Sequence, residues 1–191
     1  MGINRSYIIA VSLLLLLALV PAPATADQYV GGIPLETVQS SVVSGGLWYD
    51  SFVGTGQEHE VTKTYSLPSY TKIKWARLYV AVYTAHMQNN YEHRATVRFN
   101  GGSGMQTLGV EELRKPYTFA IDGGEPAWVN NHCNRITSDY LMWYDVTNLI
   151  TGRNPVAEVK TDQPEGYKGT FDGRIKLVTL VVAYDDGDDD E

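Results

Sequence analysis

Apolar and polar residues alternate along much of the chain, a pattern typical of strands buried on one face. The clearest stretch runs from Trp75 to Thr84. One of its faces carries small and branched apolar residues, namely Ala76, Leu78, Val80 and Val82. The other face carries Trp75, Arg77, Tyr79, Ala81 and Tyr83. The first face is therefore predicted to point into a core.

A second alternating stretch, Arg94 to Phe99, precedes Asn100-Gly101-Gly102. Asn-Gly predicts a hairpin with a type I′ turn, because both residues tolerate positive φ. Further strands are predicted at 40–53, 60–67, 105–111, 138–146, 156–161 and 174–184. The last is apolar on both faces, which indicates a central strand covered on both sides.

The number of strands, about eight, and the breaks rich in Gly, Pro and Asn predict an all-β fold. Beyond residue 26 no long stretch carries apolar residues at helical spacing, and no internal repeat is present. We therefore expect an antiparallel β-sandwich of jelly-roll type.

The N-terminus has a different pattern, in which Arg5 precedes an apolar run from Ile8 to Val20 and an Ala24-x-Ala26 site. This predicts a signal peptide at 1–26, with cleavage after Ala26. The run is shorter than the roughly 20 residues of a typical spanning helix, so an uncleaved anchor is the weaker alternative. The expected organisation is a signal peptide, a sandwich at 27–184 and an acidic terminus at 185–191. The mature protein is expected to be secreted to the cell surface without membrane insertion.

Charge narrows the set of partners, since the chain of 191 residues has 15 Lys and Arg against 22 Asp and Glu and a formal charge of −7. With no basic cluster, it is not expected to bind nucleic acid or an anionic membrane. Cys133 is the single cysteine, so no internal disulfide forms. It is interpreted as a small buried apolar residue, with pairing to another chain or to a cysteine missing from this sequence as alternatives.

Two resemblances follow from longer motifs. The passage Tyr144–Val156, with Asp145-Val146-Thr147 and Gly152-Arg153-Asn154, resembles galactose-binding-like jelly rolls, which include sugar-binding domains of glycoside hydrolases. The earlier Val97–Gly101 segment is similar to a hairpin of those domains. The resemblance implies the architecture more strongly than the ligand.

A closer resemblance covers most of the chain after residue 26. Segments 31–38, 74–83, 86–91 and, above all, 132–147 resemble the domain-of-unknown-function family numbered 3344. This implies a secreted or surface protein of methanogenic archaea, often found beside repeat and adhesion-type domains, without implying an activity. Family members continue past the Asp-rich run into another strand. Our hypothesis is that this sequence lacks those C-terminal strands, as a gene fragment or a shortened member.

The first candidate site is the face that carries Trp75, Tyr79 and Tyr83, with Arg77 as a hydrogen-bond donor. Sugars present apolar C–H faces that stack on aromatic rings, so such a ridge suits carbohydrate. The competing interpretation is that an N-terminal strand covers these rings as a second core layer.

The second candidate is a polar loop and the start of the following strand, with Trp128, Asn131, His132, Arg135 and Asp139 as tentative ligand-binding residues. His132 and Cys133 are adjacent in an extended segment and point to opposite sides, so they are not expected to share a metal or a proton. The four histidines lack the spacing of a zinc site.

Acidic residues offer two weaker possibilities. Asp139, Asp145 and Asp172 are the candidates for a glycosidase pair, but Asp145 is better explained as a turn residue that accepts backbone N–H groups. Asp186, Asp188 and Asp190 form a weak Ca²⁺ candidate without the EF-hand pattern, and a solvated tail is the preferred interpretation. No other cofactor is predicted.

These features predict a secreted cell-surface module of structural or adhesion type, with carbohydrate as the leading ligand class. The expected partner is a cell-envelope glycan or a surface protein. The chain is not expected to be an enzyme, because no convergent catalytic set appears. The alternatives are a carbohydrate-active hydrolase of envelope polysaccharide and a structural spacer without a ligand.

Overall fold

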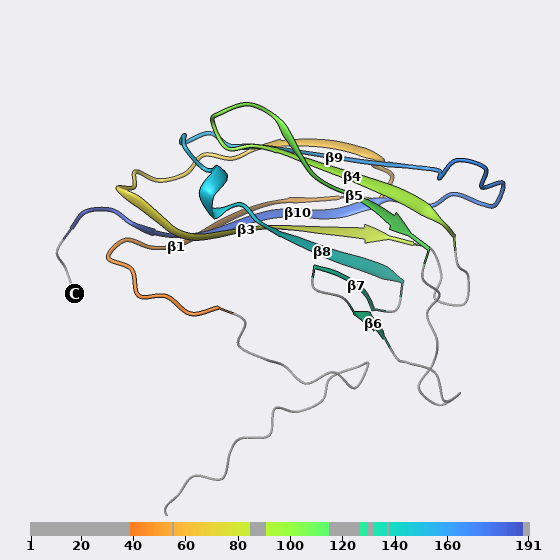
Figure 1. The fold of residues 1–191 in the computed structure, drawn as a ribbon, viewed down its shortest axis with the longest axis horizontal. Coiled ribbons are helices and arrows are strands. Elements are labelled where there is room, and N and C mark those ends of the chain that lie inside the picture. Colours follow the sequence, from red (N-terminus) through yellow and green to blue (C-terminus); the bar gives the residue numbers. More distant parts are fainter. Residues whose placement is uncertain are drawn as a thin grey trace, which may run out of the picture.

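The computed structural model describes residues 39–54, 56–84, 91–114, 127–129, 132–136 and 138–188. Within them the chain forms ten strands in two stacked antiparallel sheets (Figure 1). The strands are β1 Gly46–Val53, β2 Glu60–Thr64, β3 Lys72–Tyr83, β4 His93–Asn100, β5 Gln106–Leu113, β6 Ala127–Val129, β7 Cys133–Ile136, β8 Asp139–Asp145, β9 Val156–Asp162 and β10 Ile175–Asp185. The predicted all-β sandwich is confirmed.

The strand order is that of a jelly roll. One sheet has the order β1-β10-β3-β8-β7-β6 and the other the order β2-β9-β4-β5. Successive strands from β1 to β4 lie in alternate sheets, and β5 stays beside β4 in the four-stranded sheet. The next three strands, β6 to β8, lie in the six-stranded sheet, β9 lies in the four-stranded sheet, and β10 lies in the six-stranded sheet. Neighbours within a sheet are therefore distant in sequence, and only β4–β5 and the strands β6, β7 and β8 follow one another directly.

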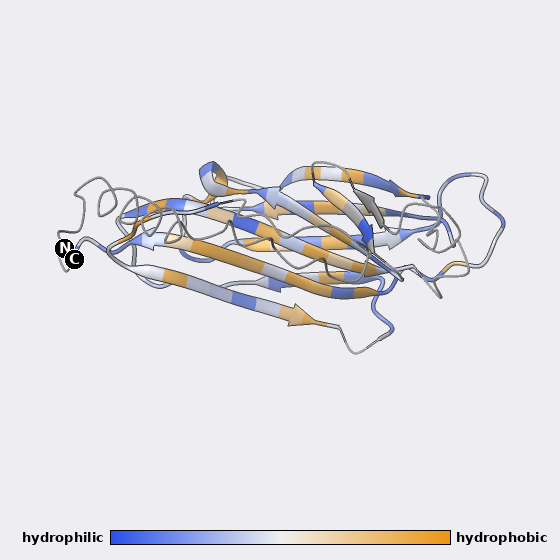
Figure 2. Ribbon diagram, turned by 90° about the horizontal axis from the view of Figure 1, so that it is seen from below, coloured by the Kyte–Doolittle hydropathy of each residue, from blue (hydrophilic) through white to orange (hydrophobic). Residues whose placement is uncertain are grey.

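The core lies between the sheets and contains the residues that alternation assigned to it. Ala76, Leu78, Val80 and Val82 on β3 are fully or almost fully buried, as are Ala95, Val97 and Phe99 on β4. Hydrophobic and hydrophilic segments follow one another along the strands in Figure 2. Cys133 is also buried, which confirms its interpretation as a small core residue.

The predicted central strand, β10, lies between β1 and β3. Its inner residues Val178, Leu180 and Val182 are buried, whereas Leu177 and Val181 on the outer face are only half-buried. The central position is confirmed, but the described residues cover only one face of the strand completely.

The β4–β5 turn differs from the sequence prediction. A type I′ turn would place Asn100 and Gly101 at positive φ, but the strands separate after the pair Phe99 and Gln106, and positive φ occurs at Gly102 and Gly104. The Asn100 side chain instead accepts the N–H groups of Gly102 at 2.9 Å and Gly104 at 3.1 Å. The Asn100 contacts make this loop a longer Asx-type turn. The Gly101 carbonyl in this loop also accepts a hydrogen bond from the Thr151 N–H.

Two strand boundaries and two short strands depart from the sequence prediction. The first strand begins at Gly46 rather than Ser40, and the second ends at Thr64 although Tyr65 and Leu67 beyond it remain in the core. The short strands β6 and β7 were not predicted, since three or four residues give too few alternations to recognise.

Parts of the sequence prediction fall outside the described residues. These are the signal peptide at 1–26, Asn131 and Asp190. Within the described part of the chain, no helix is long and apolar enough to cross a membrane.

Candidate functional site

The outer face of the six-stranded sheet gathers the first set of candidate residues. Trp75, Arg77, Tyr79 and Tyr83 alternate on β3 with the core positions, and each is half-buried. The sheet register sets Tyr79 opposite Trp143 on β8 and Arg77 opposite Val181 on β10. Sheet register thus collects aromatic and apolar side chains from several strands onto one surface.

Arg77 lies close to two tryptophan rings on this face. Its guanidinium carbon lies 3.8 Å from the ring centre of Trp143 and 5.4 Å from that of Trp75. Cation–π attraction of this kind holds a guanidinium flat against an aromatic ring. We call Trp75, Arg77 and Trp143 the aromatic stack.

Each end of the aromatic stack borders a surface hollow. Trp75 lines a hollow of about 380 Å³ with Leu47, Val181 and the segment 39–43. Trp143 lines a hollow of about 360 Å³ with His132, Asp145, the inward-facing Tyr144 and Leu108 of β5. The first hollow lies on the outer face beside β1 and β10, whereas the second opens at the edge of the sandwich where β8 faces β5. Both leave space beside the aromatic stack, which suits a ligand larger than the stack itself.

The outer face becomes more exposed toward the sheet edge formed by β1. Leu47, Tyr49 and Val53 are 67%, 71% and 68% exposed, and the register places them beside the outward residues of β10. Large exposed apolar side chains in one contiguous area are typical of binding surfaces.

A second aromatic and basic group lies at the far end of β3. The guanidinium carbon of Arg174 lies 4.4 Å from the ring centre of Tyr83, and Lys176 Nζ lies 5.0 Å from it. Asp139 pairs with Tyr83 in the register, and desolvation by burial raises the pKa of its carboxyl group. Tyr83 and Asp139, both predicted site residues, are thus brought together here.

Of the described part of the predicted polar loop, His132 alone lines the hollow beside Trp143. Its Nε2 lies 2.9 Å from Glu111 Oε1, which also accepts a hydrogen bond of 3.1 Å from the Tyr144 hydroxyl. Glu111 belongs to β5, so this group joins the two sheets at one open edge of the sandwich.

Arg135 and Trp128 do not join this surface in the described structure. Arg135 is fully buried, with its guanidinium carbon 5.5 Å from the ring centre of Tyr140, which puts it out of reach of a surface ligand. Trp128 pairs with Arg135 through the backbone of β6, and its side chain lies outside what the structure describes.

A family model described as "Protein of unknown function (DUF3344)" matches residues 28–191. The chain belongs to the DUF3344 family. No curated protein matches it.

Several solved structures resemble this DUF3344 chain weakly. Two describe infectious bursal disease virus, of the Gx strain (12% identity, TM-score 0.33) and of the Gt strain (14%, 0.32). A third is the crystal structure of the infectious bursal disease virus VP2 subviral particle (16%, 0.32). The matches cover 83%, 85% and 87% of this chain but only 37%, 40% and 41% of the viral chains.

The three candidate catalytic carboxylates of the DUF3344 chain have different surroundings. Asp145 Oδ1 accepts the Thr147 N–H at 2.9 Å, the turn contact predicted for it. Asp172 accepts two hydrogen bonds from Arg174, of 2.7 and 2.9 Å. Asp139 and Asp145 stand at opposite ends of β8, about 20 Å apart at the usual rise of a strand.

Metal ligands are not gathered in the described residues. No group of three or more His, Cys, Asp or Glu side chains among them is placed to hold an ion. Of the acidic terminus, Asp186 accepts the Asp188 N–H at 3.1 Å, a local turn contact.

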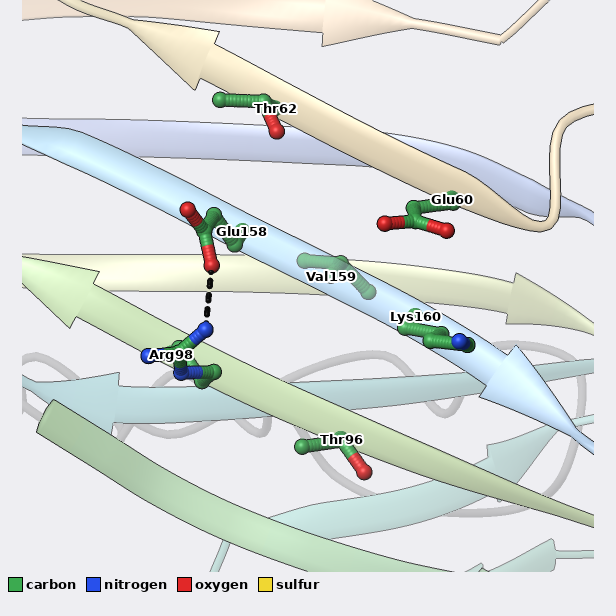
Figure 3. A pocket seen from close by; sticks show the side chains of 7 residues that line it. All are labelled: Glu60, Thr62, Thr96, Arg98, Glu158, Val159 and Lys160. Atoms are coloured by element: carbon green, nitrogen blue, oxygen red, sulfur yellow. Dashed lines mark hydrogen bonds and ion pairs between the residues drawn. The ribbon is translucent and has the colours of Figure 1, made fainter. Parts of the chain in front are cut away.

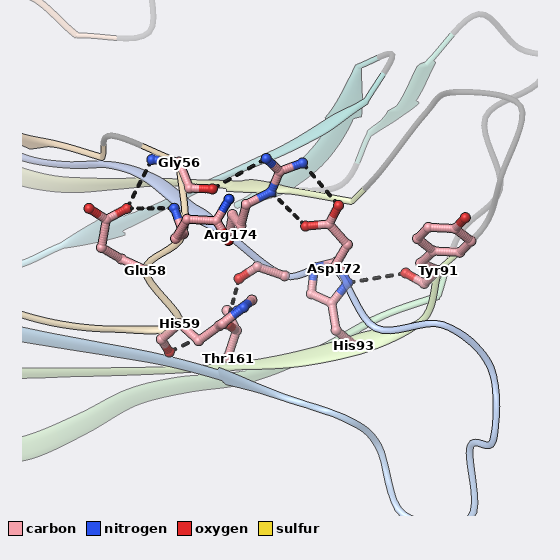
Figure 4. Close-up of polar contacts among 10 residues, drawn as sticks. Gly56, Glu58, His59, Tyr91, His93, Thr161, Asp172 and Arg174 are labelled. Atoms are coloured by element: carbon pink, nitrogen blue, oxygen red, sulfur yellow. Dashed lines mark hydrogen bonds and ion pairs between the residues drawn. The ribbon is translucent and has the colours of Figure 1, made fainter.

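Two further polar clusters in the described part of the DUF3344 chain are built around ion pairs. On the outer face of the four-stranded sheet, a hollow of about 140 Å³ contains the ion pair of Arg98 and Glu158 at 2.7 Å and no aromatic ring (Figure 3). At the end of the sandwich that carries Tyr83, Asp172 and Arg174 form an ion pair near His59 and the buried His93 (Figure 4).

Sequence reasoning missed Trp143, the residue that completes the aromatic stack. The signal was present, because Trp143 alternates with Met142 and Tyr144, which face the core. Its alignment with Tyr79 depends on the pairing of β3 with β8, which alternation within one strand does not reveal.

Proposed function

We propose that this chain is a secreted cell-surface binding module of structural or adhesion type that holds carbohydrate on the outer face of its six-stranded sheet. The observation that carries the proposal is the aromatic stack, with half-exposed Trp75 and Trp143 and a hollow beyond each. Flat rings with adjacent donors suit the C–H faces and hydroxyl groups of sugars.

The proposal assigns binding rather than hydrolysis. A glycosidase needs two carboxyl groups within roughly 5 to 10 Å of each other. Asp139 and Asp145 are farther apart along β8, and the Asp172 carboxylate is already held by Arg174. A spacer without a ligand remains the competing assignment, and a surface protein is the alternative partner.

A glycan array probed with the wild type and with Trp75→Ala and Trp143→Ala tests this function. Each substitution should lower binding at least about tenfold, because it removes a stacking surface. Tyr167→Ala, in the connection between β9 and β10, is the matched aromatic control and should bind like the wild type. If wild type and tryptophan variants bind equally, or if none binds any glycan, the carbohydrate assignment is wrong.

Export to the surface of an archaeal cell is the second part of the proposal. It rests on the predicted signal peptide and the family resemblance. Expression of the full chain in an archaeal host should give an extracellular protein that begins at Asp27, as read by N-terminal sequencing. A cell-retained protein that still begins at Met1 would contradict it.

A further inference from the structure

Arg77 differs from the other arginines whose side chains the structure describes. Most of them pair with carboxylates, namely Arg94, Arg98, Arg114 and Arg174. Arg153 donates to the Leu67 carbonyl, and Arg135 is fully buried. The Arg77 side chain makes no hydrogen bond or ion pair within the described residues, and it contacts the two tryptophan rings.

A carboxylate is available beside Arg77 but is used elsewhere. The register pairs Arg77 with Asp145, one strand away on the same face. Asp145 turns its Oδ1 to the Thr147 N–H at 2.9 Å, and no ion pair joins it to Arg77. If Arg77 served only to stabilise the sheet, pairing with this neighbour would be the simplest arrangement.

Stacking leaves the in-plane donors of the guanidinium for an external group. Nε is buried without a partner, as is Nε1 of Trp75 beside it, whereas the terminal nitrogens of Arg77 are not among the buried unsatisfied atoms. A planar guanidinium held beside aromatic rings can donate two parallel hydrogen bonds to one anion through its terminal nitrogens. The adjoining hollows leave room for the rest of a ligand.

We propose that the aromatic stack recognises an acidic sugar, with Trp75 and Trp143 against the sugar rings and Arg77 donating to its anionic group. This inference rests on the proposed carbohydrate function and specifies its ligand class. The anionic group is a ring carboxylate, as in a uronic acid, or a sulfate ester, since a guanidinium fork fits both.

The far end of β3 extends the same chemistry. Lys176 lies over Tyr83, about 20 Å from Arg77 along the strand. The second group also holds the Asp139 carboxyl group, which pairs with Tyr83 in the register. Two aromatic and charged groups on one line favour a polymer over a single monosaccharide.

Calorimetric titration of the signal-free chain with defined polymers tests the proposal. The probes are polygalacturonate, dextran sulfate, neutral dextran and poly-L-glutamate, each with wild type, Arg77→Gln and Arg77→Lys. Arg98→Gln on the opposite sheet is the matched control, because it removes the same charge from an ion pair outside the aromatic stack. Melting curves check that each variant is folded. If Arg77→Gln does not fold, Arg77→Lys, which keeps the positive charge, serves as the test variant.

The wild type should bind polygalacturonate or dextran sulfate at least tenfold more tightly than neutral dextran. Arg77→Gln should remove most of that preference, Arg77→Lys part of it, and Arg98→Gln none. Which acidic polymer binds identifies carboxylate or sulfate as the anion.

Three results would overturn the inference, with different consequences for the proposed function. Equal binding of neutral and acidic polymers, or no effect of either Arg77 substitution, would leave carbohydrate binding in place. Equal binding of poly-L-glutamate and polygalacturonate would show that charge alone is recognised and that the partner is an acidic protein. Absence of binding to every polymer by the folded wild type, together with a blank glycan array, would remove both proposals.

Discussion

His93, on β4, is fully buried against the rings of Tyr140 and Phe171. Its Nδ1 lies 3.1 Å from the Tyr91 carbonyl, and its Nε2 has no partner in the described part of the chain. Burial disfavours the charged imidazolium and lowers the pKa of His93 from 6.5 to about 4, despite the opposing contact with Tyr91. The fold therefore requires this histidine to be neutral.

The His93 pKa predicts a loss of stability at mildly acidic pH. The unfolded chain takes up a proton near pH 6.5 and the native state only near pH 4, so the unfolded state binds more protons between these values. Above pH 6.5 His93 is neutral in both states and does not lower stability. The free energy of unfolding should fall by about 3 kcal/mol as pH drops toward 4. Urea titrations of wild type and His93→Phe should show a shallower decline in the variant. Parallel curves would contradict the assignment.

Cys133 gives a second prediction for a single residue. Burial, with a smaller effect of the Glu111 charge, raises the pKa of its thiol to about 12. Because the thiolate is the reactive species, Cys133 should resist iodoacetamide at pH 8 in the native protein and react within minutes in urea. Mass spectrometry measures the modified fraction, with a short cysteine peptide as the control. Rapid native labelling would contradict this.

At the scale of elements, close approach between two loops depends on Gly101. A Cβ at Gly101 would overlap the backbone carbonyl of Leu149, the last residue of the short 3₁₀ helix η2, Thr147–Leu149. Gly101→Ala should lower the free energy of unfolding by about 2 to 3 kcal/mol. Gly152→Ala, whose nearest contact would be an ordinary 3.6 Å, is the matched control and should change stability little. Equal denaturation midpoints for the two variants would refute the role of this contact.

The turn around Gly101 also illustrates what alternation could and could not predict. Alternation located β3, β4 and their core faces, because each strand buries every second residue whatever its neighbours are. It failed at Asn100, whose side chain caps a longer loop, since that geometry depends on contacts with residues about 50 positions away. The aromatic stack was predicted in part for the same reason. Trp75 and Arg77 lie on one strand and were recognised from alternation, whereas Trp143 joins them only through the register of β3 with β8.

The whole molecule should unfold as one unit. Most strands of each sheet are separated in sequence by strands of the other sheet, so neither sheet is one continuous segment that could fold alone. Tryptophan fluorescence, with Trp48, Trp75 and Trp143 all in the six-stranded sheet, should change together with far-ultraviolet circular dichroism in urea. A fluorescence transition that precedes the circular dichroism change would contradict this expectation.

The alternation along β3 also separates two tasks that proteins often combine in one loop. Even-numbered positions from Ala76 to Val82 pack in the core, whereas the odd-numbered positions from Trp75 to Tyr83 lie on the outer face. Substitutions on the outer positions therefore leave the buried set unchanged. A library varied only at those positions and at Trp143 would convert this sheet into a scaffold whose ligand preference is selected without redesign of its interior.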